Sequence, residues 1–260
     1  MGGSKCKDRV GEKRMNNKGC LMKIIEYNNR DNIIVEFQDN YKSKVNTKYD
    51  SFVKGIVKNP YCPTLFNIGI IGNKYPSSIN GKTIKEYQTW YDMLRRCFDD
   101  EIKENRPSYK NVTCCDEWLL YENFYEWLHK QENFEKWLND NGWAIDKDII
   151  IKGNKTYSPK TCCLVPRNIN SLFTKYDKCR GDTLIGVTKK GNKFEAQCKN
   201  PLTLKKVYLG RFAIQEDAFK VYKAYKENLI KQIAQKEYSQ GNITKQCYEA
   251  MLQYEVEITD

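Results

Sequence analysis

Hydrophobic and polar residues alternate with the period of a β-strand between residues 186 and 212. In the middle of this segment, Phe194, Ala196 and Cys198 share one side, and charged or amide side chains occupy the positions between them. A Gly-Asn pair at 191–192 is typical of a short hairpin turn. The pattern therefore predicts three antiparallel strands that bury one face and leave the other face basic and open.

The hydrophobic period becomes helical beyond these strands. Apolar residues recur there at spacings of three and four, namely Ala218, Val221, Tyr222, Tyr225 and Leu229. Ala213-Ile214 offers this helix no polar cap, which should cost about 1 kcal/mol. Glu216 and Asp217 partly compensate because they place negative charge in the first turn. We expect this helix to cover the apolar face of the three strands.

Residues 20–64 predict a small β module. Strand-like stretches on both sides of the polar N-N-R-D-N segment at 28–32 indicate a β-hairpin. A third strand or a short helix is expected around 44–57. The preceding residues 1–19 are basic and poor in apolar side chains. We expect them to form an arm that is mobile or becomes ordered on a partner.

Residues 83–178 form the predicted middle domain, which follows a connecting segment at 65–82 rich in Gly, Ser, Pro and Asn. Two stretches, at 84–98 and 116–130, carry large apolar residues at helical spacing, and these residues are most simply explained as core. They are Tyr87, Trp90, Tyr91, Leu94, Trp118, Tyr121, Phe124 or Tyr125, and Leu128. A helical tail at 243–260 should pack on one of the domains. Together the patterns predict an α+β fold, with a small N-terminal β module and a middle region rich in helix.

The charge of the chain is unevenly distributed. The chain of 260 residues has room for two or three small domains and carries a net charge of +11. Residues 185–236 hold twelve Lys or Arg against four Asp or Glu, whereas residues 101–148 hold six against eleven. This contrast indicates one module that binds a polyanion. Because lysine predominates, we expect phosphate contacts by point charge and modest sequence specificity.

The cysteines indicate a reducing compartment. There are eleven, an odd number, and the N-terminus is polar and basic, unlike a secretory signal. No apolar run approaches the length of a transmembrane helix. We therefore expect reduced thiols and a cytoplasmic location.

The segment 182–236 resembles the Apetala/ethylene-response-factor type of DNA-binding domain, whose pattern is G-V, aromatic-x-A, L-G-x-F, acidic-A and A-Y. The matching residues are Gly186, Val187, Phe194, Ala196, Leu209, Gly210, Phe212, Ala218 and Tyr222. The resemblance implies a sheet that lies in the major groove of duplex DNA. Ile185 and Thr188 stand where plant members usually carry arginine, so the family's base preference does not carry over. The residues expected to contact DNA are Lys189, Lys193, Gln197, Lys206, Tyr208 and Arg211.

Three further signatures occur in order: W-Y-D-M-L-R-R-C, then C-D-E-W, then a stretch from I-D-K-D to P-R-N-I-N. Together they resemble bacteriophage-borne HNH-like proteins, related to homing endonucleases, that often carry an Apetala-type domain at the C-terminal end. The resemblance covers roughly residues 84–260. It implies a protein that is encoded by a phage or prophage and acts on duplex DNA in the bacterial cytoplasm.

In an active HNH site, two strands and a helix present a metal ion and a histidine general base to a phosphodiester. The matching residues here are Asp146, Lys147 and Asp148, with Asn170 as the later helical asparagine. Lys147 stands in place of the histidine, and a lysine with a pKa of roughly 10.4 cannot accept a proton from water at neutral pH. If this segment is a strand, Asp146 and Asp148 point to opposite faces and do not hold one metal. The only histidine, His129, is expected at the surface.

Cys97, Cys115 and Cys162 fall within the three signatures. They are candidates for a structural zinc site, which requires four ligands. However, the chain has no C-x-x-C pair, and a fourth ligand is not evident. Buried thiols are the alternative interpretation.

Three functions follow from these observations. The first is a DNA-binding protein with a degenerate HNH-like scaffold. The second is an active, magnesium-dependent endonuclease of homing type that uses Asp146 or Asp148. The third is an inhibitor or binder of a host defence complex, in which the basic face contacts a protein. Duplex DNA is the expected partner in the first two, and a protein partner is expected in the third.

Overall fold

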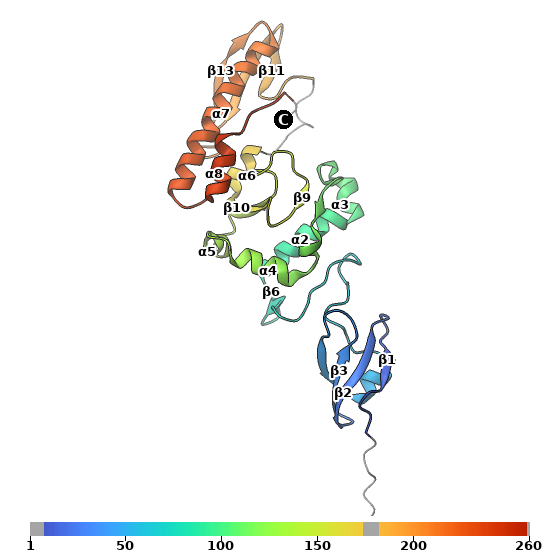
Figure 1. Cartoon of the computed structure of the whole chain (residues 1–260). Coiled ribbons are helices and arrows are strands. Elements are labelled where there is room, and N and C mark those ends of the chain that lie inside the picture. Colours follow the sequence, from blue (N-terminus) through green and yellow to red (C-terminus); the bar gives the residue numbers. More distant parts are fainter. Residues whose placement is uncertain (1–7, 174–181, 259–260) are drawn as a thin grey trace, which may run out of the picture. The chain divides into compact units, whose positions relative to one another are not determined.

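The structure is a computed structural model, and it describes residues 8–173 and 182–258. The start of the predicted basic arm, residues 174–181 and the last two residues of the tail lie outside the described residues, as do Cys6 and Cys179. The fold is α+β, as the sequence predicts. Figure 1 shows the order of the elements along the chain.

The chain divides into two compact units. The first comprises residues 1–109 and 116–125, and the second comprises residues 110–115 and 126–260. Helix α4 begins in the first unit and ends in the second, because its bounds are Tyr121–His129. No helix among the described residues combines the length and the apolar character needed to cross a bilayer.

The first unit begins with a four-stranded antiparallel sheet in the order β1-β2-β3-β4. The elements are β1 (Lys13–Met15), β2 (Leu21–Asn29), β3 (Asn32–Phe37), β4 (Lys44–Thr47) and α1 (Tyr49–Val53). Alternate residues of β2 and β3, such as Met22 and Val35, pack against Phe52 of α1 to form the core. Lys13 pairs with Lys23, so residues 13–15 of the predicted arm belong to this sheet.

The remainder of the first unit is mainly helical, and its aromatic core is confirmed. Its elements are β5 (Ser78–Ile79), β6 (Lys82–Thr83), α2 (Lys85–Phe98), α3 (Asp100–Asn105), η1 (Pro107–Tyr109), η2 (Asp116–Leu119) and the start of α4. Trp90, Trp118, Tyr121 and Phe124 are fully buried. The indole N–H of Trp90 donates to the carbonyl oxygen of Trp118 at 2.7 Å, which joins α2 to η2.

A buried carboxylate organises the segment that was predicted as a connecting loop. Glu122 accepts hydrogen bonds from the backbone N–H groups of Asn73 and Lys74 at 2.8 and 2.7 Å. The Tyr61 hydroxyl also donates to this carboxylate, at 3.2 Å. Gly72, at φ +78°, leaves room for it, because a Cβ there would lie 2.2 Å from Glu122 Oε1. The loop is therefore fixed to α4 by one side chain.

The described residues of the second unit form three small sheets, β7-β9, β8-β10 and β11-β12-β13, together with several helices. The elements before residue 174 are β7 (Thr113–Cys114), α5 (Phe134–Asn139), β8 (Trp143–Asp146), β9 (Thr156–Tyr157), β10 (Cys163–Pro166) and α6 (Arg167–Phe173). Those after residue 181 are β11 (Val187–Lys190), β12 (Lys193–Lys199), β13 (Lys206–Phe212), α7 (Gln215–Ser239) and α8 (Lys245–Leu252). Strands β8 and β10 are antiparallel, and α6 follows β10 directly.

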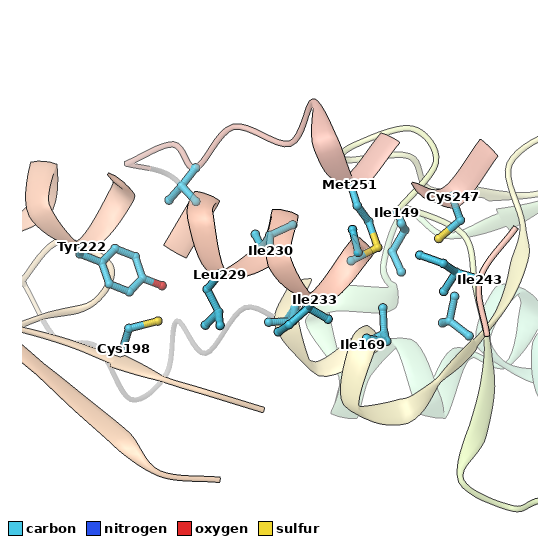
Figure 2. Packing of buried hydrophobic residues seen from close by; sticks show 14 of the residues in the cluster. Ile149, Ile169, Cys198, Tyr222, Leu229, Ile230, Ile233, Ile243, Cys247 and Met251 are labelled. Atoms are coloured by element: carbon cyan, nitrogen blue, oxygen red, sulfur yellow. The ribbon is translucent and has the colours of Figure 1, made fainter. Parts of the chain in front are cut away.

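One hydrophobic core connects β10 and α6 with the C-terminal sheet and helices. Figure 2 shows part of this core, with residues of α7 such as Leu229 and Ile233 near Ile169 of α6. The tail helix α8 contributes Cys247 and Met251 to the same core. The C-terminal sheet is therefore held by packing to the rest of its unit.

Helix α7 begins as the sequence predicts, but its buried stripe includes Phe219 in place of Val221. Ile214 is the N-cap and its side chain forms no capping hydrogen bond, while Glu216 and Asp217 occupy the first turn. Ala218 and Tyr222 are buried, as expected. The prediction for Val221 is wrong, because this side chain is 36% exposed and lies outside the stripe that faces the sheet.

Candidate nucleic-acid interface

The C-terminal sheet has two chemically different faces. Val187, Ala196 and Cys198 are buried in the core that α7 covers. Cross-strand pairing places the intervening residues on the opposite, outward face. These residues are Thr188 and Lys190 of β11, Lys193, Glu195, Gln197 and Lys199 of β12, and Lys206, Tyr208 and Arg211 of β13. We call this set the outward face.

Lysines occupy both ends of the outward face. Lys190 lies opposite Lys193 at the Gly191-Asn192 turn, and Lys199 lies opposite Lys206 at the other end. The six residue steps from Lys193 to Lys199 span about 20 Å, at about 3.3 Å per residue. Like charges directly opposite each other destabilise a sheet. These lysine pairs therefore favour an anionic partner.

A β-bulge places Arg211 on the outward face. Ala196 pairs with Gly210 but Gln197 pairs with Tyr208, so Leu209 is the extra residue. Leu209 packs against the core. Gly210 adopts φ +132°, a backbone conformation that favours glycine. Without the bulge, strict alternation from Tyr208 would turn Arg211 towards α7.

The register also separates two neighbouring lysines. Lys189 pairs with Phe194, whose ring packs against the core, so Lys189 lies on the helix side of β11 although it is exposed. Its neighbour Lys190 takes the outward position instead. Of the six residues expected to contact DNA, the other five lie on the outward face, and Tyr208 is 60% exposed there. Lys190 and Lys199 also face outward, although the sequence analysis did not name them among the residues expected to contact DNA.

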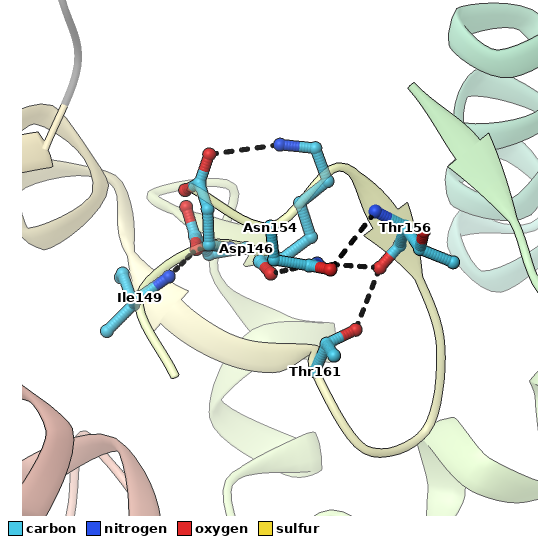
Figure 3. Close-up of polar contacts among 7 residues, drawn as sticks. Asp146, Ile149, Asn154, Thr156 and Thr161 are labelled. Atoms are coloured by element: carbon cyan, nitrogen blue, oxygen red, sulfur yellow. Dashed lines mark hydrogen bonds and ion pairs between the residues drawn. The ribbon is translucent and has the colours of Figure 1, made fainter. Parts of the chain in front are cut away.

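The second candidate region is the turn after β8 (Figure 3). Asp146 is the last residue of β8 and is only 5% exposed. Its Oδ1 accepts the backbone N–H groups of Asp148 and Ile149, each at 2.8 Å. Asp148 lies beyond the strand, so the condition under which it and Asp146 would point to opposite faces does not hold. Strand alternation no longer applies where the chain turns.

The two carboxylates influence each other. Burial and then the charge of Asp148 raise the pKa of Asp146, against the effect of the two backbone N–H groups, to a net value of about 6. Lys147 Nζ forms an ion pair with Asp148 Oδ2 at 3.0 Å. The Lys147 side chain is buried and its ammonium lies 5.7 Å from the centre of the Tyr157 ring. The lysine at the histidine position thus neutralises a neighbouring carboxylate.

An asparagine fixes the loop that follows. Asn154 Nδ2 donates to the carbonyl oxygens of Lys147 at 2.7 Å and Thr156 at 2.8 Å. Thr161 Oγ1 donates to the same Thr156 carbonyl at 2.8 Å. Asn170, the predicted later asparagine, is half-buried on α6. The sequence resemblance matches Gly153-Asn154 to the Gly-Asn of the HNH signature, and the hydrogen bonds of Asn154 give it a structural role in the turn.

The residues of the predicted zinc site lie on different parts of the fold. Cys97 is on α2 in the first unit, whereas Cys115 and Cys162 belong to the second. No group of three or more His, Cys, Asp or Glu side chains in the described part of the chain is arranged to hold a metal ion. Burial raises the pKa of Cys162 to about 12, which disfavours the thiolate that zinc binds. The described residues therefore do not fit a zinc site.

His129 is exposed at the end of α4, and its ring lies 4.0 Å from that of Phe134. The Cys163 and Cys247 thiols are in contact in the core, and this contact together with burial raises the pKa of Cys163. His129 is at the surface, as the sequence predicts.

Comparison with models of protein families, with curated proteins and with solved structures finds no match to this chain. The functional argument therefore depends on the residues and their geometry.

Proposed function

We propose that the protein binds duplex DNA through the outward face, and that the strand–strand–helix of β8, β10 and α6 serves as a scaffold without cleavage activity. The observation that carries the proposal is the charge of that face. Within strands β11 to β13, which the structure describes in full, it carries five cations and one carboxylate. Such a face attracts phosphates, and its polar centre is available to base edges.

The shape of the sheet supports a duplex partner. Two or three strands fit into the major groove, which is about 12 Å wide. The lysine pairs at the two ends of the outward face, separated by about 20 Å of strand, can reach the phosphates that border this groove. Thr188, Gln197 and Tyr208 lie between these ends and carry hydrogen-bonding groups.

The polar groups near β8 support a structural role for that region. Asp146 Oδ1 accepts two backbone N–H groups and Asp148 Oδ2 is paired with Lys147. These contacts engage one oxygen of each carboxylate, and no group of three or more His, Cys, Asp or Glu side chains within residues 8–173 and 182–258 is arranged to hold a metal ion. We therefore derive no reaction step through magnesium.

Charge removal on the outward face tests the proposal. Lys193→Gln and Lys206→Gln should each weaken binding to a short random-sequence duplex and reduce the salt slope of log K by about 0.9. Lys231→Gln, on the solvent side of α7, removes the same charge elsewhere and should change neither quantity. Equal effects of all three substitutions, or none from the first two, would mean that the outward face is not the binding surface.

Metal-dependent cleavage is a second candidate because the Asp146 and Asp148 carboxylates interact. Supercoiled plasmid is incubated with the protein and either Mg²⁺ or Mn²⁺, and nicking is followed on a gel. We expect no nicking above a buffer control. Nicking that is lost in Asp148→Asn, a variant at a half-buried position, would establish the nuclease instead.

A further inference from the structure

The centre of the outward face holds a cross-strand ion pair. Glu195 of β12 lies directly opposite Arg211 of β13. Arg211 Nε is 3.8 Å from Glu195 Oε1, and Arg211 Nη2 donates to the carbonyl oxygen of Lys190 at 3.1 Å. Because Lys190 is on β11, the arginine side chain crosses the middle strand and lies over the sheet. The guanidinium is thus oriented by acceptors on two different strands.

This pair differs from the lysines in net charge. Glu195 and Arg211 together add no charge to the face, so they contribute little to the release of counterions that drives non-specific binding. A phosphate that approached Arg211 would also approach the Glu195 carboxylate and be repelled by it. A neutral base edge meets no such repulsion. The pair is therefore better suited to bases than to the backbone.

The pair also matches one base pair chemically. In the major groove, guanine presents the O6 and N7 acceptors and cytosine presents its N4 amino donor. An arginine fork donates to O6 and N7, and a glutamate accepts from N4. Arg211 and Glu195 remain 47% and 19% exposed in their side chains, so both are open to such contacts. Among the described residues, Arg211 Nη1 has no hydrogen-bond acceptor.

We propose that Arg211 and Glu195 recognise one G·C base pair, with Arg211 contacting guanine and Glu195 contacting the paired cytosine. Glu195 also acts as a positioning residue for the guanidinium. This inference rests on the proposed DNA binding through the outward face. It assigns sequence preference to the single arginine of that face, whereas the lysines contact phosphates irrespective of sequence.

The test starts with selection from a random duplex library by the full-length protein, followed by titration of the selected site. We expect one position with a G·C requirement. Arg211→Lys keeps the charge but loses the fork, and it should reduce discrimination at that position by about 5- to 150-fold. Glu195→Gln should broaden the preference at the same position. Affinity of Arg211→Lys for random DNA at matched salt should stay within about twofold, because this change keeps the cation. Glu195→Gln removes the carboxylate that repels phosphate, so it should raise the affinity for random DNA.

Modified bases locate the contact. Replacing the preferred guanine by 7-deazaguanine removes N7 and should weaken wild-type binding but not that of Arg211→Lys, whose preference is already lost. Thermal unfolding of each variant serves as a folding control. Unchanged preference in Arg211→Lys, equal losses with 7-deazaguanine in both proteins, or a wild-type site without a G·C position would overturn the inference while DNA binding stands. If wild-type protein does not bind duplex DNA, both the inference and the proposed function are wrong.

Discussion

The outward face and the turn after β8 both concentrate charged side chains, but they use them in opposite ways. At the turn, Asp146 accepts two backbone N–H groups and Lys147 is paired with Asp148. On the outward face, cross-strand neighbours include lysine opposite lysine at both ends. Charges with internal partners stabilise a local structure, whereas like charges that face solvent together destabilise the sheet and favour an anionic partner. The comparison therefore separates a structural region from the proposed binding surface.

Removing the Asp146 carboxylate should have the largest effect, because it tests the structural side of the comparison. Asp146→Ala leaves two backbone N–H groups without their acceptor and should lower the free energy of unfolding by about 2–5 kcal/mol. Asp146→Asn retains an oxygen that accepts both, so it should change stability by no more than about 1 kcal/mol. Denaturant unfolding at pH 7 measures both. Similar losses of stability in the two variants would show that the missing acceptor oxygen does not cause the loss.

The pH dependence of stability is a second test of the structural role of Asp146. The pKa of Asp146 is raised from 3.8 to about 6 in the folded protein. The folded state therefore binds a proton more tightly than the unfolded state, and stability from this group increases as pH falls from about 6 to about 4. The gain is of the order of 3 kcal/mol, at about 1.4 kcal/mol per pKa unit.

Other carboxyl groups titrate in the same range with shifts of opposite sign, since the pKa values of Asp50 and Asp99 are lowered. The measurement is therefore the difference in unfolding free energy between wild type and Asp146→Asn from pH 4 to pH 7. We expect wild type to gain on the variant as pH decreases. A difference that stays constant with pH would mean that the pKa of Asp146 is not raised in the folded protein.

The β-bulge is the next target, because it determines which residues belong to the binding surface. Gly210→Ala places a side chain at φ +132°, where the new Cβ would also lie 3.0 Å from the Phe212 ring. We expect a loss of about 1–3 kcal/mol in the free energy of unfolding. If the strand relieves the strain by losing the bulge, Arg211 turns towards α7 and sequence preference is lost with it. Gly191→Ala, at an open turn with φ +62°, is the matched control with backbone strain but no effect on register.

The sequence predicts the strands and their buried side because Ala196 and Cys198 alternate with polar residues over an unbroken stretch. Arg211 was expected to contact DNA, but strict alternation from Tyr208 would turn it inward, and the bulge at Gly210 that places it outward interrupts the alternation without a change in hydrophobicity. For the same reason, Asp148 was placed by extending a strand that ends at Asp146. The ion pair of Glu195 with Arg211 depends on the register of two strands, which a single sequence does not specify. The hydrophobic period thus identifies the strands and helices, whereas the ends of these elements and irregularities such as the bulge position the residues of the candidate site.

The smallest expected effect separates Lys189 from Lys190, two adjacent and exposed lysines on opposite sides of β11. Lys190→Gln removes a cation that faces the same side as Lys193, so it should weaken duplex binding severalfold and reduce the salt slope of log K by about 0.9. Lys189→Gln removes the same charge one residue away, on the side of Phe194, and should change the slope by much less. Titrations at several salt concentrations measure both slopes. If Lys189 and Lys190 contribute equally, net charge rather than the outward face determines binding, and the contrast between a structural region and a binding surface loses its geometric basis.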